Sequence, residues 1–384
     1  MDLSPASLVA MFSVFGLGVC MSILGSVKIR LTEQLSIDDA QMGKMFSVFN
    51  ISNFIFVILA GILCDVLGFK FVAIFGFIAG FIAIFMFAQA KNYGMALFGC
   101  FLLGIGGMFM NSVGNTLLAN PEILFESATK SNNMGNVFFG VGAFFVPMLT
   151  AWLFQKTSYA NAVSVIAVIV LIPVILAFIA AFPSAEGVGF SFAAAVQLIS
   201  QPQIFMCAIA LLCYIALEVS MGGWISTYMA KGVGADDTKA NLVLSYFWIS
   251  LMIGRLITAL VIGGVLINLD LHGAWFVTGL AVFAAIMLFI LTKINTIGAA
   301  TTCIVLIGLA FAPMFPTIAG LMFTRTDPSL GGSGFGIIFA VGLIGAIFVP
   351  AWIGSISKGK DIKSSMIVLA GTAAILVVIG IIMG

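Results

Sequence analysis

Long apolar segments recur along the whole chain and limit what it can fold into. Each is about 20 residues long, the length that a helix needs to cross a hydrocarbon layer about 30 Å thick. Apolar residues make up 62% of the sequence and charged residues only 8%, whereas soluble domains carry about 25% charged residues. No water-soluble fold could cover so much apolar surface. The sequence therefore predicts an all-α membrane protein that crosses the bilayer many times.

Twelve such segments are separated by short polar connectors. We expect spans near residues 8–30, 42–64, 70–91, 94–118, 132–155, 160–182, 203–229, 240–266, 272–292, 299–322, 332–356 and 364–383. The first segment lacks the positive flank and the cleavage site of a signal peptide, so we expect it to stay as a span. The longest polar interruption lies in the middle of the chain. It predicts an N-terminal six-helix bundle (1–182), a central cytoplasmic linker (183–202) and a C-terminal six-helix bundle (203–384).

Two sets of residues recur in the same order in both halves, about 200 positions apart. The first set is Asp38-Asp39, Ser47, Phe49, Ile51 and Ser52, which recurs as Asp236-Asp237, Ser245, Phe247, Ile249 and Ser250. The second is Gly142-Ala143-x-Phe145-Val146-Pro147, which recurs as Gly345-Ala346-x-Phe348-Val349-Pro350. Such repetition is typical of transporters whose two bundles are related by a pseudo-two-fold axis. We expect the second span to match the eighth, and the fifth to match the eleventh.

The connector after the second span resembles the signature loop of the major facilitator superfamily. It reads Gly61-x-x-x-Asp65-x-x-Gly68-x-Lys70. Its glycines suit a tight turn, and its acid suits a helix terminus or a basic group nearby. A basic residue usually follows the acid in this family, whereas Val66 stands here. The resemblance implies two pseudo-symmetric six-helix bundles, with Gly61, Asp65, Gly68 and Lys70 as gating or structural residues.

Further segments resemble the fucose/glucose/galactose symporter branch and its sodium-dependent glucose-transporter-like relatives. They are Asn132-Asn133-x-x-Asn136-x-Phe138-Phe139-Gly140-x-Gly142-Ala143, Cys213-Tyr214-x-x-x-Glu218-x-x-x-Gly222-Gly223-Trp224-Ile225-x-Thr227-Tyr228, Ile253-Gly254-Arg255 and Met314-Phe315-Pro316-Thr317. Proton-linked members of the branch carry an acid on the first span and another on the fourth, where this sequence has Gly25 and Asn111. This departure argues against proton coupling by the route that the resemblance implies. Coupling through Glu218, coupling to a sodium ion, and facilitated diffusion stay open.

Two charges lie deep in the spans of the second half, Glu218 on the seventh span and Arg255 on the eighth. Charged groups inside a bilayer are costly, so they face a cavity or pair with one another. Helical rise counted from opposite membrane faces places the two within about one turn of the same depth. We expect a buried pair in which protonation of Glu218 would release Arg255. The alternatives are a purely structural Glu218 and an Arg255 that caps helix ends in the gate.

The deep polar groups of the first half are neutral. Asn111 and Asn115 share one helix face of the fourth span, and Asn136 lies on the fifth. Carboxamides both donate and accept hydrogen bonds, which suits a ligand with hydroxyl groups. We therefore expect these asparagines to bind substrate, with hydrogen bonding between helices as the structural alternative.

Three further residues are candidates for contact with the solute. Trp224 and Tyr228 lie one turn apart beside two glycines, where a sugar ring could stack on them. Their alternative is the aromatic belt at the membrane interface. Lys28 closes the first span together with Arg30, and both either extend to the interface or attract an anionic solute.

Several functions are excluded by the sequence. It has no phosphate-binding loop and no hydrolase or metalloprotease motif, so we expect neither an enzyme nor an ATP-driven pump. The six cysteines lie scattered in apolar segments and predict no metal or redox site. A net charge of +1 without a basic run predicts no nucleic-acid partner. We expect no cofactor beyond a coupling proton or sodium ion, and a monomer by resemblance.

The sequence predicts a multi-pass protein of a cell membrane, and we expect the bacterial inner membrane. Its orientation stays open, because cytoplasmic termini would place most lysines on outer loops, against the positive-inside rule. As function we predict secondary active transport of a sugar or a similar small polar solute by alternating access. The alternatives are an exporter or exchanger of organic anions or amphipathic compounds, and a non-transporting membrane sensor with the same fold.

Overall fold

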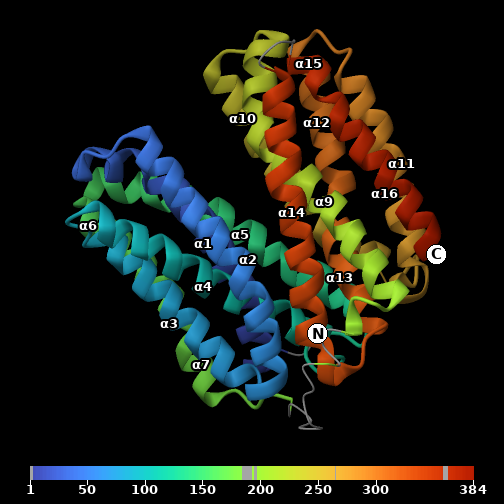
Figure 1. Ribbon diagram of the computed structural model, residues 1–384, viewed down its shortest axis with the longest axis horizontal. Helices are drawn as coiled ribbons and strands as arrows, with labels where there is room; N and C mark the ends of the chain where they lie inside the picture. The colour runs from blue at the N-terminus through green and yellow to red at the C-terminus, as the bar shows by residue number, and fades with distance from the viewer. Residues whose placement is uncertain (1–2, 184–192, 194–196, 264, 358–361) are drawn as a thin grey trace. The chain divides into compact units, whose positions relative to one another are not determined.

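The structure is a computed structural model that describes residues 3–183, 193, 197–263, 265–357 and 362–384. Twelve of its helices are long and apolar enough to cross a membrane, and the described residues contain helices but no β-strand (Figure 1). Each helix falls on one of the predicted spans, with ends that differ by a few residues. The predicted all-α class and its twelve spans are confirmed.

Polar side chains cap the starts of several of the first six spans. They are α1 (Pro5–Leu35), α2 (Asp39–Leu67), α3 (Phe69–Ala88), α4 (Tyr93–Ala119), α5 (Ala128–Lys156) and the pair α6 (Tyr159–Leu171) and α7 (Pro173–Ile179). The side chains of Ser4, Asp38, Asn92 and Ser158 accept a backbone N–H in the first turn of the helix that follows them. Caps of this kind satisfy donors that a helix start leaves open. Pro173 lacks a backbone N–H and separates α6 from α7.

The last six spans contain more irregular helix. They are α9 (Pro202–Thr227) with the π-helix η1 (Tyr228–Gly232), α10 (Asp237–Ile257) with the π-helix η2 (Thr258–Ile262), α11 (Leu269–Leu291), α12 (Ile297–Phe311) with α13 (Met314–Thr324), the turn η3 (Pro328–Leu330) leading into α14 (Gly331–Ser357), and α15 (Ile362–Ser365) with α16 (Ile367–Met383). The helix α9 passes through Gly222 and Gly223 without a break. Pro313 lies between α12 and α13.

Residue contacts divide the chain into two units. The first contains Met1–Glu126, Phe138–Ala195 and Asp327–Gly336, and the second contains Ser127–Val137, Val196–Thr326 and Ile337–Gly384. The first turns of α5 thus belong to the second unit, and the first turns of α14 belong to the first unit. Most of the predicted linker, 183–202, lies outside the described residues, and the predicted bundle limits at 182 and 203 stay a prediction.

The sequence repeats correspond to the same packing contact within each unit. In the first unit, a Cβ on Gly142 of α5 would overlap the carbonyl oxygen of Phe15 on α1. In the second unit, a Cβ on Gly345 of α14 would overlap the carbonyl oxygen of Leu212 on α9. Only glycine lets two helix backbones approach this closely. The repeated Gly-Ala-x-Phe-Val-Pro segment therefore marks a close helix crossing in each unit.

The other repeat behaves in the same way. Ser52 on α2 lies against Gly104 of α4, where a Cβ would be 2.5 Å from the serine Cβ. Ser250 on α10 lies against Gly308 of α12, where a Cβ would overlap the serine hydroxyl. Both hydroxyl groups donate to backbone carbonyls at 2.7 Å. The second and eighth spans thus play matching roles, as the sequence predicts.

Candidate functional site

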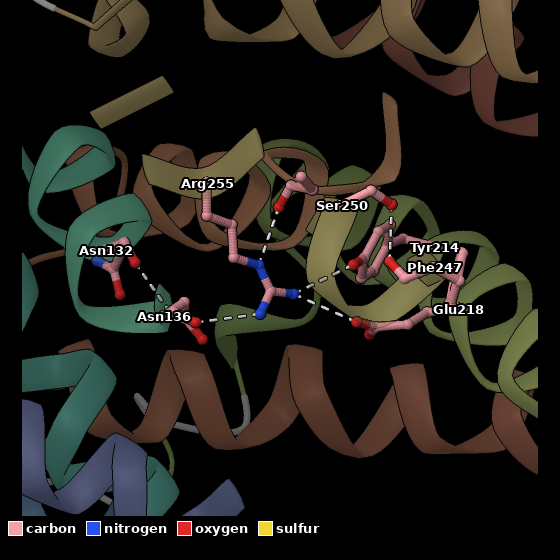
Figure 2. A network of polar contacts seen from close by, with 8 residues as sticks. Asn132, Asn136, Tyr214, Glu218, Phe247, Ser250 and Arg255 are labelled. Atoms are coloured by element: carbon pink, nitrogen blue, oxygen red, sulfur yellow. Dashed lines mark hydrogen bonds and ion pairs between the residues drawn. The ribbon is translucent and has the colours of Figure 1, made fainter. Parts of the chain in front are cut away.

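A buried ion pair joins α9 and α10 in the second unit. Arg255 Nη2 lies 3.2 Å from Glu218 Oε1, and the side chains are 4% and 16% exposed. Figure 2 shows the guanidinium group between Asn136 on one side and Tyr214 and Glu218 on the other. Removing one partner of such a pair leaves an uncompensated charge, at a cost of about 3–5 kcal/mol. The structure brings together the two charges that the sequence pairs.

Tyr214 lies one turn before Glu218 on α9 and completes this side of the network. Its hydroxyl oxygen accepts a hydrogen bond from Arg255 Nη2 at 3.4 Å. The tyrosine is fully buried, and its ring packs against Phe311 and Phe315, with centroids 6.2 Å away in each case. This packing holds the phenol in place beside the ion pair.

A proline explains the next contact of Arg255. Pro316 has no backbone N–H, so it cannot donate to the carbonyl of Ala312 four residues earlier. Arg255 Nε donates to this Ala312 oxygen at 3.0 Å. Gly254 permits the approach, because a Cβ there would lie 2.5 Å from the Ala312 Cβ and 3.1 Å from the Leu309 carbonyl oxygen. Arg255 of the segment Ile253-Gly254-Arg255 therefore donates to the carbonyl that Pro316 leaves without a helical donor.

The first turns of α5 provide the remaining side of the network. Arg255 Nη1 donates to the backbone oxygen of Asn136 at 3.2 Å. The side chain of Asn136 donates to the Asn132 carbonyl at 2.9 Å, and Asn132 and Asn133 donate in the same way to carbonyls four residues earlier. The Oδ1 atoms of Asn132 and Asn133 are buried without a hydrogen-bond partner. These two acceptors lie on the helix that Arg255 contacts.

Asp65 holds the start of α14 within the first unit. Its carboxylate accepts hydrogen bonds from the backbone N–H groups of Gly332 (2.8 Å) and Ser333 (2.7 Å), and from the Ser333 hydroxyl (2.6 Å). A carboxylate is favourable at this position because the N-terminus of a helix carries partial positive charge. Gly61 lies against Gly332, where a Cβ would overlap its carbonyl oxygen. The acid of the loop thus meets a helix terminus, one of the two partners expected for it.

Asp270 performs the same task for α5 within the second unit. Its Oδ1 accepts from the Thr129 backbone N–H at 3.1 Å and from the Thr129 hydroxyl at 2.8 Å. The backbone of Thr129 also lies where a Cβ on Gly320 would be, 2.5 Å from the threonine Cα. Our sequence reasoning missed Asp270. Asp270 lies about 200 residues after Asp65. The sequence repeats have the same separation, so they could have identified it.

The remaining loop residues have local structural roles. Gly68 adopts a φ of 78°, a conformation that side chains rarely tolerate, and it links α2 to α3. Lys70 Nζ donates to the carbonyl oxygen of Phe178 near the end of α7, at 2.8 Å. A cation is favourable at a helix C-terminus.

The asparagines of α4 form a pair in the first unit. Asn115 Nδ2 donates to Asn111 Oδ1 at 2.9 Å and to the Asn111 carbonyl at 3.0 Å, and both residues are fully buried. The Nδ2 group of Asn111 is buried without a hydrogen-bond partner. The predicted shared face is therefore present, with one amide group left to donate.

The aromatic and basic candidates make local contacts of their own. Tyr228 is fully buried, and its hydroxyl donates to the Leu291 carbonyl at 2.7 Å. Trp224 is partly exposed and lies against Gly354 of α14, where a Cβ would be 3.2 Å from the indole ring. Lys28 is exposed. Its neighbour Arg30 lies 5.2 Å from the centre of the Phe154 ring, a contact typical of an interfacial cation.

No group of three or more possible metal ligands occurs among the described residues. All six cysteines are free and buried. The residues around Arg255 provide an ion pair, buried amide groups and backbone carbonyls. Such a set can exchange a proton and hydrogen-bond a polar solute.

Comparison with known proteins agrees with the twelve-helix fold. A family model for the Major Facilitator Superfamily matches residues 7–350. The Protein TsgA homolog of Erwinia tasmaniensis is 25% identical over 390 residues, covering 92% of this chain and 95% of that protein. Protein TsgA of Salmonella paratyphi B is 26% identical over 380 residues, covering 90% and 94%.

Solved structures show the same fold. The crystal structure of FucP, a Major Facilitator Superfamily transporter in the outward conformation, superposes with a TM-score of 0.82, at 17% identity over 98% of both chains. The E. coli fucose:proton symporter FucP gives a TM-score of 0.79, at 19% identity over 99% of this chain and 98% of that one. Because the family model covers most of the sequence, this chain belongs to the Major Facilitator Superfamily and is a multi-pass membrane transporter.

Proposed function

We propose that this transporter moves a sugar or a similar small polar solute by alternating access, and that Glu218 takes up a coupling proton. The buried pair of Glu218 and Arg255 carries the proposal, because ionisable groups inside a span mark substrate or proton sites. The fold shared with the E. coli fucose:proton symporter supports the solute class. By the resemblance to proton-linked members of the branch, Gly25 and Asn111 stand where those members carry acids, which favours a different proton site.

Arg255 links the charge of Glu218 to the packing of the second unit. The guanidinium group donates to α9 through Glu218, to the α12–α13 break through Ala312, and to α5 through Asn136. Protonation of Glu218 removes the counter-charge of Arg255 while the two carbonyl contacts remain. A conformation that gives Arg255 a new partner then becomes more favourable. Proton binding and conformational change are coupled by this difference in free energy.

Buried amide groups support a solute that carries hydroxyl groups. Asn132 and Asn133, both on α5, have buried acceptors that no protein group satisfies. Each such group costs about 1–3 kcal/mol unless a water molecule or a ligand satisfies it. A polyhydroxylated solute offers hydroxyl donors to both acceptors.

We propose Asp65 and Asp270 as the paired gate residues. Each binds the N-terminus of a helix, α14 or α5, whose later turns belong to the other contact unit. Loss of these hydrogen bonds would leave the backbone N–H groups of the first turn of each helix without their acceptor. Charge-assisted bonds of this kind contribute about 1.5–3 kcal/mol each, enough to bias a conformational equilibrium.

Uptake into proteoliposomes tests the proposal. Radiolabelled neutral hexoses and their hexuronic acids are offered with and without imposed proton or sodium gradients. The wild type, Glu218→Gln and the matched control Glu33→Gln, an exposed glutamate on α1, are compared. We expect uptake of a panel member driven by the proton gradient in the wild type and the control, and lost in Glu218→Gln. Uptake of no member, or uptake that ignores both gradients, would overturn the proposal and favour a non-transporting sensor or a facilitator.

A further inference from the structure

The charges of the ion pair indicate which charge the solute should have. Arg255 is almost fully buried, and Glu218 is its counter-ion. We propose that the solute carries a carboxylate, and that this carboxylate pairs with Arg255 while Glu218 holds the coupling proton. The inference rests on the proposed function and names the substrate class of the same site, a hydroxylated organic acid such as a sugar acid.

The net charge of the site changes through the transport cycle. Without solute, the Glu218 carboxylate and the Arg255 guanidinium group cancel. If one proton and a neutral solute bind, the site holds a net positive charge in a low-dielectric interior. If one proton and a monoanion bind, the solute carboxylate replaces that of Glu218, and the site is neutral again. An uncompensated buried charge costs about 3–5 kcal/mol, so the anion is the solute that proton uptake favours.

No other carboxylate among the described neighbours is placed to take over from Glu218. The helices α13, α14 and α16, which pack against α9, contain no titratable residue. Arg255 is the charged group that reaches Glu218 from α10, and Tyr214, Cys207 and Cys213 are the other titratable groups of α9. Lys130 lies on α5 about 9 Å along the helix from Asn136. Its charge is positive and would also favour an anion.

The geometry of the pair suits an exchange of partners. The Arg255–Glu218 contact is 3.2 Å long, compared with about 2.7–2.9 Å for a tight charge-assisted hydrogen bond. Guanidinium groups bind carboxylates with two parallel hydrogen bonds when the partner is free to align. A solute carboxylate has this freedom, whereas Glu218 is attached to α9. The buried Oδ1 atoms of Asn132 and Asn133 on α5 could accept from hydroxyl groups of the same solute.

Matched solutes that differ only in the carboxylate provide the test. Glucose is compared with glucuronate, and galactose with galacturonate, in proteoliposomes with an imposed proton gradient. We expect the acid of a pair to be taken up and its neutral partner not to compete. Proton–monoanion uptake moves no net charge, so an inside-negative potential should change accumulation less than about twofold. Proton-driven uptake of a neutral hexose, accelerated by that potential, would overturn this inference and leave the proposed function standing.

Binding to purified protein tests separately whether the solute carboxylate pairs with Arg255 and whether Glu218 holds the proton. For the wild type, affinity for the acid should fall about tenfold for each pH unit at the alkaline end, because binding takes up a proton. Glu218→Gln resembles the protonated state and should bind the acid equally at acidic and alkaline pH. Arg255→Gln should lose this binding, and its fold can be checked by the cysteine-protection assay described below. Weaker binding of the acid to Glu218→Gln than to the wild type at acidic pH would contradict the exchange of carboxylates.

Discussion

A glycine-to-alanine series should separate the close helix crossings from positions that face open space. In Gly142→Ala and Gly345→Ala, the new Cβ overlaps the carbonyl oxygens of Phe15 and Leu212. Ordinary contact begins at 3.4 Å, so each helix pair would have to separate by about 1 Å, and overpacking of this size costs about 1–3 kcal/mol. Gly279→Ala on α11 is the matched control, because its Cβ meets nothing within 4 Å. Alanine favours helix over glycine by about 0.5–1 kcal/mol, so the control should become more stable.

The buried cysteines provide the assay. All six are free and buried, so a thiol-reactive fluorescent dye should label the detergent-solubilised protein only as it unfolds on heating. Gly142→Ala and Gly345→Ala should unfold at lower temperature than the wild type, and Gly279→Ala at the same or a higher temperature. If all three variants unfold alike, the assignment of the Gly-Ala-x-Phe-Val-Pro repeat to helix crossings is wrong.

The same assay, together with uptake, tests three further variants. Asp65→Asn should lower the unfolding temperature more than Ser333→Ala does, because the serine variant keeps both backbone hydrogen bonds to the carboxylate; equal effects would contradict the cap. Asp270→Asn should weaken the start of α5 in the same way, and an unchanged uptake rate would argue against its gate role. Tyr228→Phe should cost about 1 kcal/mol of stability through the lost bond to Leu291 and leave uptake unchanged. A selective loss of solute binding would instead identify Tyr228 as a substrate contact.

Hydropathy was enough to predict the fold, because each span must be long and apolar to cross the bilayer. The repeats could also be recognised in the sequence. A side chain at Gly142 or Gly345 would overlap the facing helix, so glycine is needed at both positions. The pairing of Glu218 with Arg255 followed from the cost of isolated charges in a span. Each of these features depends on one large effect: the hydrophobicity of a span, the overlap of two helices, or the cost of an isolated charge.

Other features of the site depend on tertiary geometry that the sequence does not contain. Pro316 shows that the Ala312 carbonyl loses its helical donor, but the donor that replaces it comes from another helix. The contact of Arg255 with Asn136 arises because the first turns of α5 pack in the second unit. The hydrogen bond from the Tyr228 hydroxyl to a carbonyl of α11 likewise depends on how the helices pack, and its spacing in the sequence does not indicate it.

The central claim is that Glu218 couples proton movement to solute movement. The most direct test compares two activities of Glu218→Gln in proteoliposomes, exchange of solute across the membrane and accumulation of solute driven by a proton gradient. We predict that exchange is retained, because the binding site and the fold remain, and that accumulation is lost. Accumulation at the wild-type level in Glu218→Gln, under a proton gradient alone, would contradict the claim and leave the Glu218–Arg255 pair as a structural contact.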